Sequence, residues 1–189
     1  MVYLHHGGPN VAKVVTKGPN LTKMDAETRP LPVVPPPLGI YPARVDEKGR
    51  LKLPADFQQY LNAIFMVEAS ERRVFITSLD LRTVRIYPLS LWKYNERLLE
   101  QETEDPEAAA DLAFLAKDLG GSSELDSQGR VLVPAELRQL LSLESQPVHL
   151  DCYKGRISVL TEEVYREKQS KSRENVQEKL SRMERKGLC

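Results

Sequence analysis

An Asp-x-x-Gly-Arg motif occurs twice in this sequence, the second copy 80 residues after the first. An arginine directly after a tight turn projects from the edge of a loop, and its planar guanidinium can bond guanine O6 and N7, or a phosphate, in a bidentate way. The pattern therefore favours Arg50 and Arg130 as groups that contact nucleic acid. Asp46 and Asp126, in the same loops, are the residues expected to orient them.

The motif also has a purely structural explanation, because Asp and Gly build turns and the arginine can close an ion pair back to the aspartate. For the aspartates this explanation is favoured over direct DNA contact. The arginines differ in their neighbours: Lys48 and Lys52 flank Arg50, whereas the residues around Arg130 are neutral. Arg50 with its two lysines is therefore the first candidate for base or phosphate contacts, and Arg130 is the second.

The two motifs lie within a longer internal repeat. Residues 46–57 and 126–137 share Asp, Gly, Arg, Pro and Ala at matching positions, and three apolar positions are conserved in kind. Each copy predicts a turn, then a short strand at 50–53 or 130–133, then a helix that a proline opens in its first turn. An internal duplication is the economical explanation.

Each half continues with a hairpin and a second helix, so that its expected order is strand, helix, strand, strand, helix. The expected hairpin strands are 74–76 and 83–87 in the first half and 148–150 and 156–160 in the second. The following helices start near Pro88 and Thr161, and Thr161 has the hydroxyl of an N-cap. The fold class is therefore α+β, with two tandem pseudo-symmetric units and flanking helices.

Composition divides the 189 residues into five segments. The first 38 residues hold seven of the thirteen prolines and few periodic apolar positions, which is typical of disorder. Residues 96–111 hold seven acids and one base, and residues 166–189 hold eight bases and four acids, although the whole chain has zero net charge. The expected segments are 1–38 (disordered, Pro-rich), 39–101 (first half), 102–118 (acidic connector), 119–168 (second half) and 169–189 (charged helical tail).

Several functional classes have no supporting motif. There is no phosphate-binding loop, no Gly-x-Gly-x-x-Gly and no Ser or Cys beside a plausible His base, so we expect no enzyme and no catalytic residue. Two cysteines and three histidines do not cluster as metal ligands, so we expect no metal and no other cofactor. Apolar runs are too short to span a bilayer and no secretory signal is evident, which favours the cytoplasm and no membrane partner.

The double motif resembles the two halves of the MraZ family. The resemblance covers roughly residues 39–168 and includes 86–92 and 124–138 beside the motifs. It implies two tandem AbrB-like, swapped-hairpin units that form closed homo-oligomeric rings. It also implies a nucleoid-associated transcriptional regulator that binds repeated boxes in double-stranded promoter DNA of the division and cell-wall gene cluster. The family signature Asp-x-x-x-Arg falls on Asp46 and Arg50, and on Asp126 and Arg130. The first 38 residues and the sequence at 161–165 depart from the family pattern.

Two other functional classes remain open. A ring of duplicated β units could serve as a structural or protein-interaction module for which DNA is irrelevant. Alternatively, an AbrB-type antitoxin would bind a toxin through its tail, although a mostly charged tail disfavours this. Salt dependence separates DNA binding from the module, because only phosphate neutralisation gives a steep dependence of affinity on salt.

Overall fold

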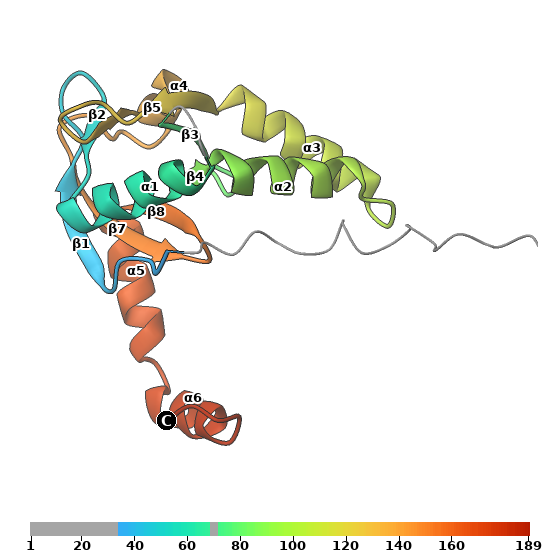
Figure 1. The fold of residues 1–189 in the computed structure, drawn as a ribbon. Coiled ribbons are helices and arrows are strands. Elements are labelled where there is room, and N and C mark those ends of the chain that lie inside the picture. Colours follow the sequence, from blue (N-terminus) through green and yellow to red (C-terminus); the bar gives the residue numbers. More distant parts are fainter. Residues whose placement is uncertain (1–33, 69–71) are drawn as a thin grey trace, which may run out of the picture.

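The computed structural model describes residues 34–68 and 72–189, and both halves of the chain run through strands and helices in the same order (Figure 1). The elements of the first half are β1 (Ile40–Arg44), β2 (Arg50–Lys52), α1 (Ala55–Glu68), β3 (Arg73–Thr77), β4 (Thr83–Pro88) and α2 (Leu89–Glu100). After α3 (Pro106–Asp118), the second half has β5 (Gly121–Glu124), β6 (Arg130–Leu132), α4 (Ala135–Leu140), β7 (Pro147–Tyr153), β8 (Arg156–Thr161) and α5 (Glu162–Arg173). A last helix, α6 (Val176–Glu184), follows. The expected α+β class is confirmed.

The strands of the two halves are interleaved. Six antiparallel strands form one sheet in the order β1-β7-β8-β4-β3-β5, and β2 and β6 form a separate two-stranded ribbon. The first strand of each half pairs with the hairpin of the other half, since β1 pairs with β7 and β5 pairs with β3. The two hairpins meet in the middle of the sheet through β4 and β8. Neither half therefore completes its sheet alone.

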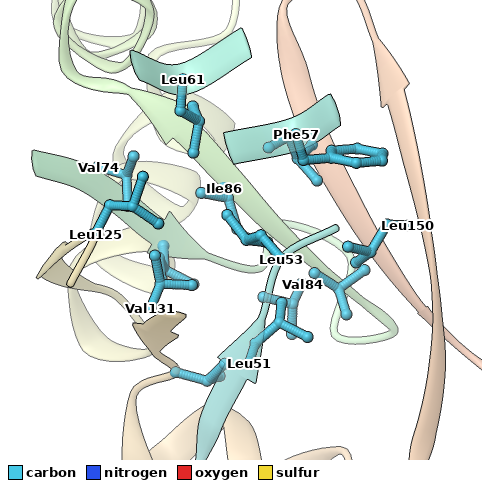
Figure 2. Packing of buried hydrophobic residues seen from close by; sticks show 14 of the residues in the cluster. Leu51, Leu53, Phe57, Leu61, Val74, Val84, Ile86, Leu125, Val131 and Leu150 are labelled. Carbon is cyan, nitrogen blue, oxygen red and sulfur yellow. The ribbon is translucent and has the colours of Figure 1, made fainter. Parts of the chain in front are cut away.

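The main hydrophobic core lies between this sheet, the ribbon and α1, and both halves supply it (Figure 2). Leu51 and Val131 are directly paired across the ribbon and are 0% and 1% exposed. The apolar stripe predicted on α1 is confirmed, because all four of its side chains are buried: Phe57, Tyr60, Leu61 and Ile64. Each first helix begins one residue after its proline rather than at it, with Pro134 as the N-cap of α4.

Three elements were absent from the predicted order. Strand β5 has the sequence Gly-Ser-Ser-Glu, and β1 contains Pro42 at its centre and has no buried residue, so neither shows the apolar alternation typical of a strand. They are strands because hairpins of the opposite half supply partners for their backbones. Helix α3 occupies most of the segment expected as an acidic connector, with Asp105 as N-cap accepting from the Ala108 N–H at 3.2 Å.

Helices α2 and α3 form an arm held by a second, smaller cluster. Trp92 stacks on Phe75 of β3 with ring centroids 4.2 Å apart, and Ala116 is fully buried beside it. The Thr77 hydroxyl donates to the Ala116 carbonyl at 2.9 Å, which ties α3 to the sheet. The arm projects from the sheet as two adjacent helices (Figure 1).

The two chain ends differ in how much of them is described. Residues 1–33 of the predicted disordered segment lie outside the described residues, whereas Val34 packs against the main core. At the other end, Thr161 caps α5 as predicted, accepting from the Val164 N–H at 3.3 Å. His149 of β7 bonds Glu162 at 2.6 Å and stacks on Tyr165, which anchors α5 to the sheet. Within 34–68 and 72–189, no helix combines the length and apolar character needed to cross a bilayer.

Substituting Leu51 tests the ribbon as part of the core. Leu51→Ala should lower the free energy of unfolding by about 2–5 kcal/mol, because it opens a cavity between both halves. Leu132→Ala, on the same ribbon but 52% exposed, is the matched control and should change it by less than about 0.5 kcal/mol. Urea unfolding at one protein concentration, followed by the fluorescence of the single tryptophan, measures both. Equal effects would contradict the buried position of Leu51.

Candidate nucleic-acid interface

Each Asp-x-x-Gly-Arg motif forms a tight turn around its aspartate. In the first loop, the Asp46 carboxylate accepts the backbone N–H groups of Lys48 at 2.9 Å and Arg50 at 2.8 Å. The Gly49 N–H donates to the Asp46 carbonyl at 2.9 Å, and Gly49 has a φ of 76°, which favours glycine. The second loop repeats these bonds with the same distances. The predicted turn is therefore present in both copies.

The same aspartates hold the arginine side chains. The Arg50 guanidinium donates through Nε and Nη2 to Asp46 Oδ2, each at 2.8 Å, and Arg130 Nε donates to Asp126 Oδ2 at 2.8 Å. The Arg50 and Arg130 side chains nevertheless stay 35% and 25% exposed. The ion pair expected from the structural explanation is thus present. It limits the freedom of the guanidinium without removing it from solvent, so bracing and DNA contact are compatible.

These hydrogen bonds also set the charge state of the loops. The backbone N–H of Arg50, followed by its side chain and the Lys48 N–H, lowers the pKa of Asp46 below its ordinary value, although partial burial opposes this. The Arg130 and Gln128 groups lower the pKa of Asp126 in the same way. Both aspartates are therefore ionised at neutral pH, as a brace for a guanidinium requires.

The two loops are joined across the ribbon. The Leu53 N–H donates to the Gly129 carbonyl and the Val133 N–H donates to the Gly49 carbonyl, both at 3.0 Å. Each loop is thus bonded to the strand that follows the other loop. A Cβ on Gly129 would lie 2.1 Å from the end of the flexible Gln58 side chain, which would have to move, and the φ of 73° at this position also favours glycine.

One side of the ribbon is basic. Leu51 and Val131 face the core, so the alternation of a strand places their neighbours on the solvent side. The four solvent-side residues are Arg50, Lys52, Arg130 and Leu132, of which three are cationic. The candidate interface comprises this side of the ribbon and the two loops at its ends, including the exposed Lys48.

Lys52 belongs with the second loop rather than the first. It is paired directly with Arg130 across the ribbon, and its ammonium group bonds the Gln128 carbonyl. Arg50, in contrast, is opposite Leu132. Arg130 has no basic neighbour in the sequence, but Lys52 of the other half places a positive charge beside it. The sequence-based ranking of Arg50 above Arg130 loses its physical basis.

Arg72 and Arg73 are further basic residues beside the second loop that the sequence-based site left out. The Arg72 carbonyl accepts the N–H of Leu125, the residue before Asp126, at 3.0 Å. Arg73 is paired with Glu124. The first loop has the equivalent bond with a neutral residue: the Gln146 carbonyl accepts from the N–H of Val45, the residue before Asp46, at 3.3 Å. An Arg-Arg pair before a predicted strand is visible in sequence, but only the pairing of β3 with β5 brings it to this loop.

The described residues contain neither a cluster of metal ligands nor an activated Cys152. Among 34–68 and 72–189, no three His, Cys, Asp or Glu side chains gather closely enough to hold a metal ion. Burial raises the pKa of Cys152 to about 11, so its thiol is protonated at neutral pH and unsuited to nucleophilic attack. Within the described residues, the paired loops are therefore the candidate functional site.

Comparisons with known proteins found a family model and several relatives that this chain is similar to. A family model described as "MraZ protein, putative antitoxin-like" matches residues 121–186. The chain is 42% identical over 101 residues to the transcriptional regulator MraZ of Acidobacterium capsulatum, a match that covers 53% of this chain and 66% of that protein. It is 34% identical over 149 residues to the transcriptional regulator MraZ of Heliobacterium modesticaldum, which covers 76% of this chain and 95% of that protein.

Titration of the loop aspartates tests the brace. The pKa values of Asp46 and Asp126 in the folded protein should lie below 3.8. Their stabilising contribution is then complete above pH 3.8, the value for the unfolded chain, and is lost as the pH falls through the folded-state pKa. NMR titration of the side-chain carboxyl carbons measures this directly.

Arg50→Ala provides the internal control for that titration. The pKa of Asp46 should rise but stay lowered, because the backbone N–H of residue 50, the largest cause, remains. Asp126 in the other loop should not shift. A wild-type pKa at or above 3.8 for either aspartate would show that the brace does not form in solution.

Proposed function

This chain belongs to the MraZ family, and we propose that it is a sequence-specific DNA-binding transcriptional regulator whose paired loops contact double-stranded promoter DNA. The observation that carries the proposal is the basic side of the ribbon, where Arg50, Lys52 and Arg130 project together. A two-stranded β ribbon fits the major groove of B-DNA, where base pairs are distinguishable. The names of the relatives support the same function.

The braced arginines are proposed to contact bases. A guanidinium held by a carboxylate presents its remaining N–H groups in a fixed plane, which suits guanine O6 and N7 and lowers the entropy lost on binding. Asp46 and Asp126 then orient Arg50 and Arg130 rather than touch DNA. Lys48 and Lys52 neutralise phosphates and set the position of the ribbon along the groove.

A homo-oligomeric ring is proposed as the DNA-binding form. One ribbon offers few contacts, so high affinity requires several ribbons on one assembly that meet repeated promoter boxes. The strand exchange between halves, with β1 on β7 and β5 on β3, supports assigning two AbrB-like swapped-hairpin units. The proposed target is the promoter of the division and cell-wall gene cluster, and the proposed location is the nucleoid in the cytoplasm.

An antitoxin-like role is the second candidate. It is favoured by the description of the matching family model, whose matched residues extend through α5 and α6. Such a protein would bind a protein partner through this tail, and its affinity for DNA would not depend on the ribbon.

Alanine substitutions in the ribbon separate these functions. Arg50→Ala and Arg130→Ala should each weaken specific DNA binding by about 1–3 kcal/mol per engaged subunit, with similar losses because Lys52 lies beside Arg130. Lys52→Ala should weaken all sequences alike and reduce the slope of log affinity against log salt by about 1. Lys93→Ala, an exposed lysine on α2, is the matched control and should change neither quantity.

Fluorescence anisotropy with specific and scrambled duplexes, at two or more salt concentrations, measures these effects. Thermal melts establish that each variant is folded. Unchanged specific binding by a folded protein with both arginines replaced would rule out the ribbon as the DNA-binding surface.

Assembly has its own test. Light scattering after size-exclusion chromatography should give a mass several-fold above 21.4 kDa, the mass of one chain. The expectation follows from the small contact area of one ribbon, which needs several copies to bind repeated boxes tightly. A monomer at micromolar concentration would contradict the proposed ring while leaving the contact between ribbon and DNA to be judged by the anisotropy measurements.

A further inference from the structure

Helix α6 has an apolar face that stays partly exposed within one copy of the chain. Val176, Leu180 and Met183, here called the α6 stripe, follow helical spacing and are 51%, 40% and 46% exposed. No residue of α6 is buried. Three exposed apolar side chains in one line mark a surface that associates with another apolar surface.

Basic residues lie along one flank of the α6 stripe. At about 100° per residue, Lys186, just past the helix end, falls about 60° from Met183, and Arg182 falls about 100° from it, both on the side opposite Glu184. Both are exposed. The surface that covers the stripe should therefore be apolar at its centre and acidic beside it.

The outer face of α3 has that character. Phe114 is 73% exposed, the most exposed aromatic side chain among the described large hydrophobic residues. The same helical spacing places Glu107, Asp111 and Asp118 on the face of Phe114, and all three are exposed. These four residues are here called the acidic face of α3. An aromatic ring among carboxylates is suited to a basic, apolar helix, since cations also bind over the ring.

The two surfaces lie on separate parts of one chain. The arm of α2 and α3 projects from one side of the molecule, whereas α5 leads α6 away from the sheet in another direction (Figure 1). Within one copy they are therefore not in contact. Two copies can bring them together, and a contact between different surfaces repeats from copy to copy and closes a ring when the rotation allows.

We propose that the α6 stripe of one copy docks on the acidic face of α3 in a second copy. Leu180 and Met183 cover Phe114, and the basic flank of α6 lies against Asp111 and Asp118. This inference rests on the proposed self-assembly and names one contact that contributes to it. The same contact would account for the separation of charge along a chain of zero net charge, because the acidic arm of one copy attracts the basic tail of another.

Charge reversal with mixing of variants tests the contact. D111K/D118K and R182E/K186E should each weaken self-association at least about tenfold, because like charges then meet. An equimolar mixture should restore it, since the acidic tail of the second variant meets the basic face of the first. K168E/K171E, on α5, makes the same charge change elsewhere in the tail and is the matched control. Dilution series followed by mass photometry give the dissociation constants.

Alanine variants test the apolar part of the proposed contact between copies. Phe114→Ala and Leu180→Ala should weaken self-association while the chain stays folded by circular dichroism, because both side chains are exposed in one copy. Met66→Ala, 85% exposed on α1, should leave self-association unchanged. A recovery that fails on mixing, or wild-type association by both charge-reversed variants, would overturn the proposal.

Other occupants of the α6 stripe give different results with the same variants. If R182E/K186E lowers affinity for scrambled duplex DNA, or for vesicles of anionic phospholipid, at unchanged self-association, the tail binds that ligand and the contact between copies is wrong. Because Arg50 and Arg130 are intact in every variant, anisotropy on a duplex with a single box, which needs only one ribbon, measures specific DNA binding separately from assembly. A several-fold mass without any effect of these substitutions would overturn only the docking of α6.

Discussion

The pairing of β2 with β6 is the contact on which the rest of the structure depends. Each motif loop is bonded to the strand that follows the other loop, through the Gly49 and Gly129 carbonyls. Leu51 and Val131 meet beneath them in the shared core. Because a short strand has few backbone bonds of its own, neither loop would keep this geometry without the opposite half. Duplication thus provides both a fold and a pair of arginines on one surface.

The same pairing explains how a chain of zero net charge can have a basic surface. Alternation along two strands places Leu51 and Val131 inward and cationic residues outward. Each turn aspartate is bonded to backbone N–H groups and to its own arginine, whose charge it offsets. Lys48 and Lys52 therefore supply the excess positive charge of this surface. Acidic residues gather instead on the α2–α3 arm, away from the ribbon (Figure 1).

The sequence predicted the local features well, because short-range interactions decide them. The turns around Asp46 and Asp126 follow from Asx hydrogen bonds and a glycine with positive φ. The stripe on α1 and the Thr161 cap of α5 follow from helix periodicity and from the unpaired N–H groups of a first turn. Strand β5 could not be predicted in this way, because Gly-Ser-Ser-Glu has no apolar alternation and becomes a strand only against β3.

For this protein, the sequence alone determined the repeat, the α+β class and the equivalent positions of Asp46, Arg50, Asp126 and Arg130 in two turns. Tertiary structure decided which residues surround each arginine. Lys52 follows Arg50 in sequence but lies opposite Arg130, and Arg72 reaches the second loop through the pairing of β3 with β5. The physical reason is that strand pairing depends on backbone hydrogen bonds, which every residue type can make. The composition of a strand therefore does not specify its partner.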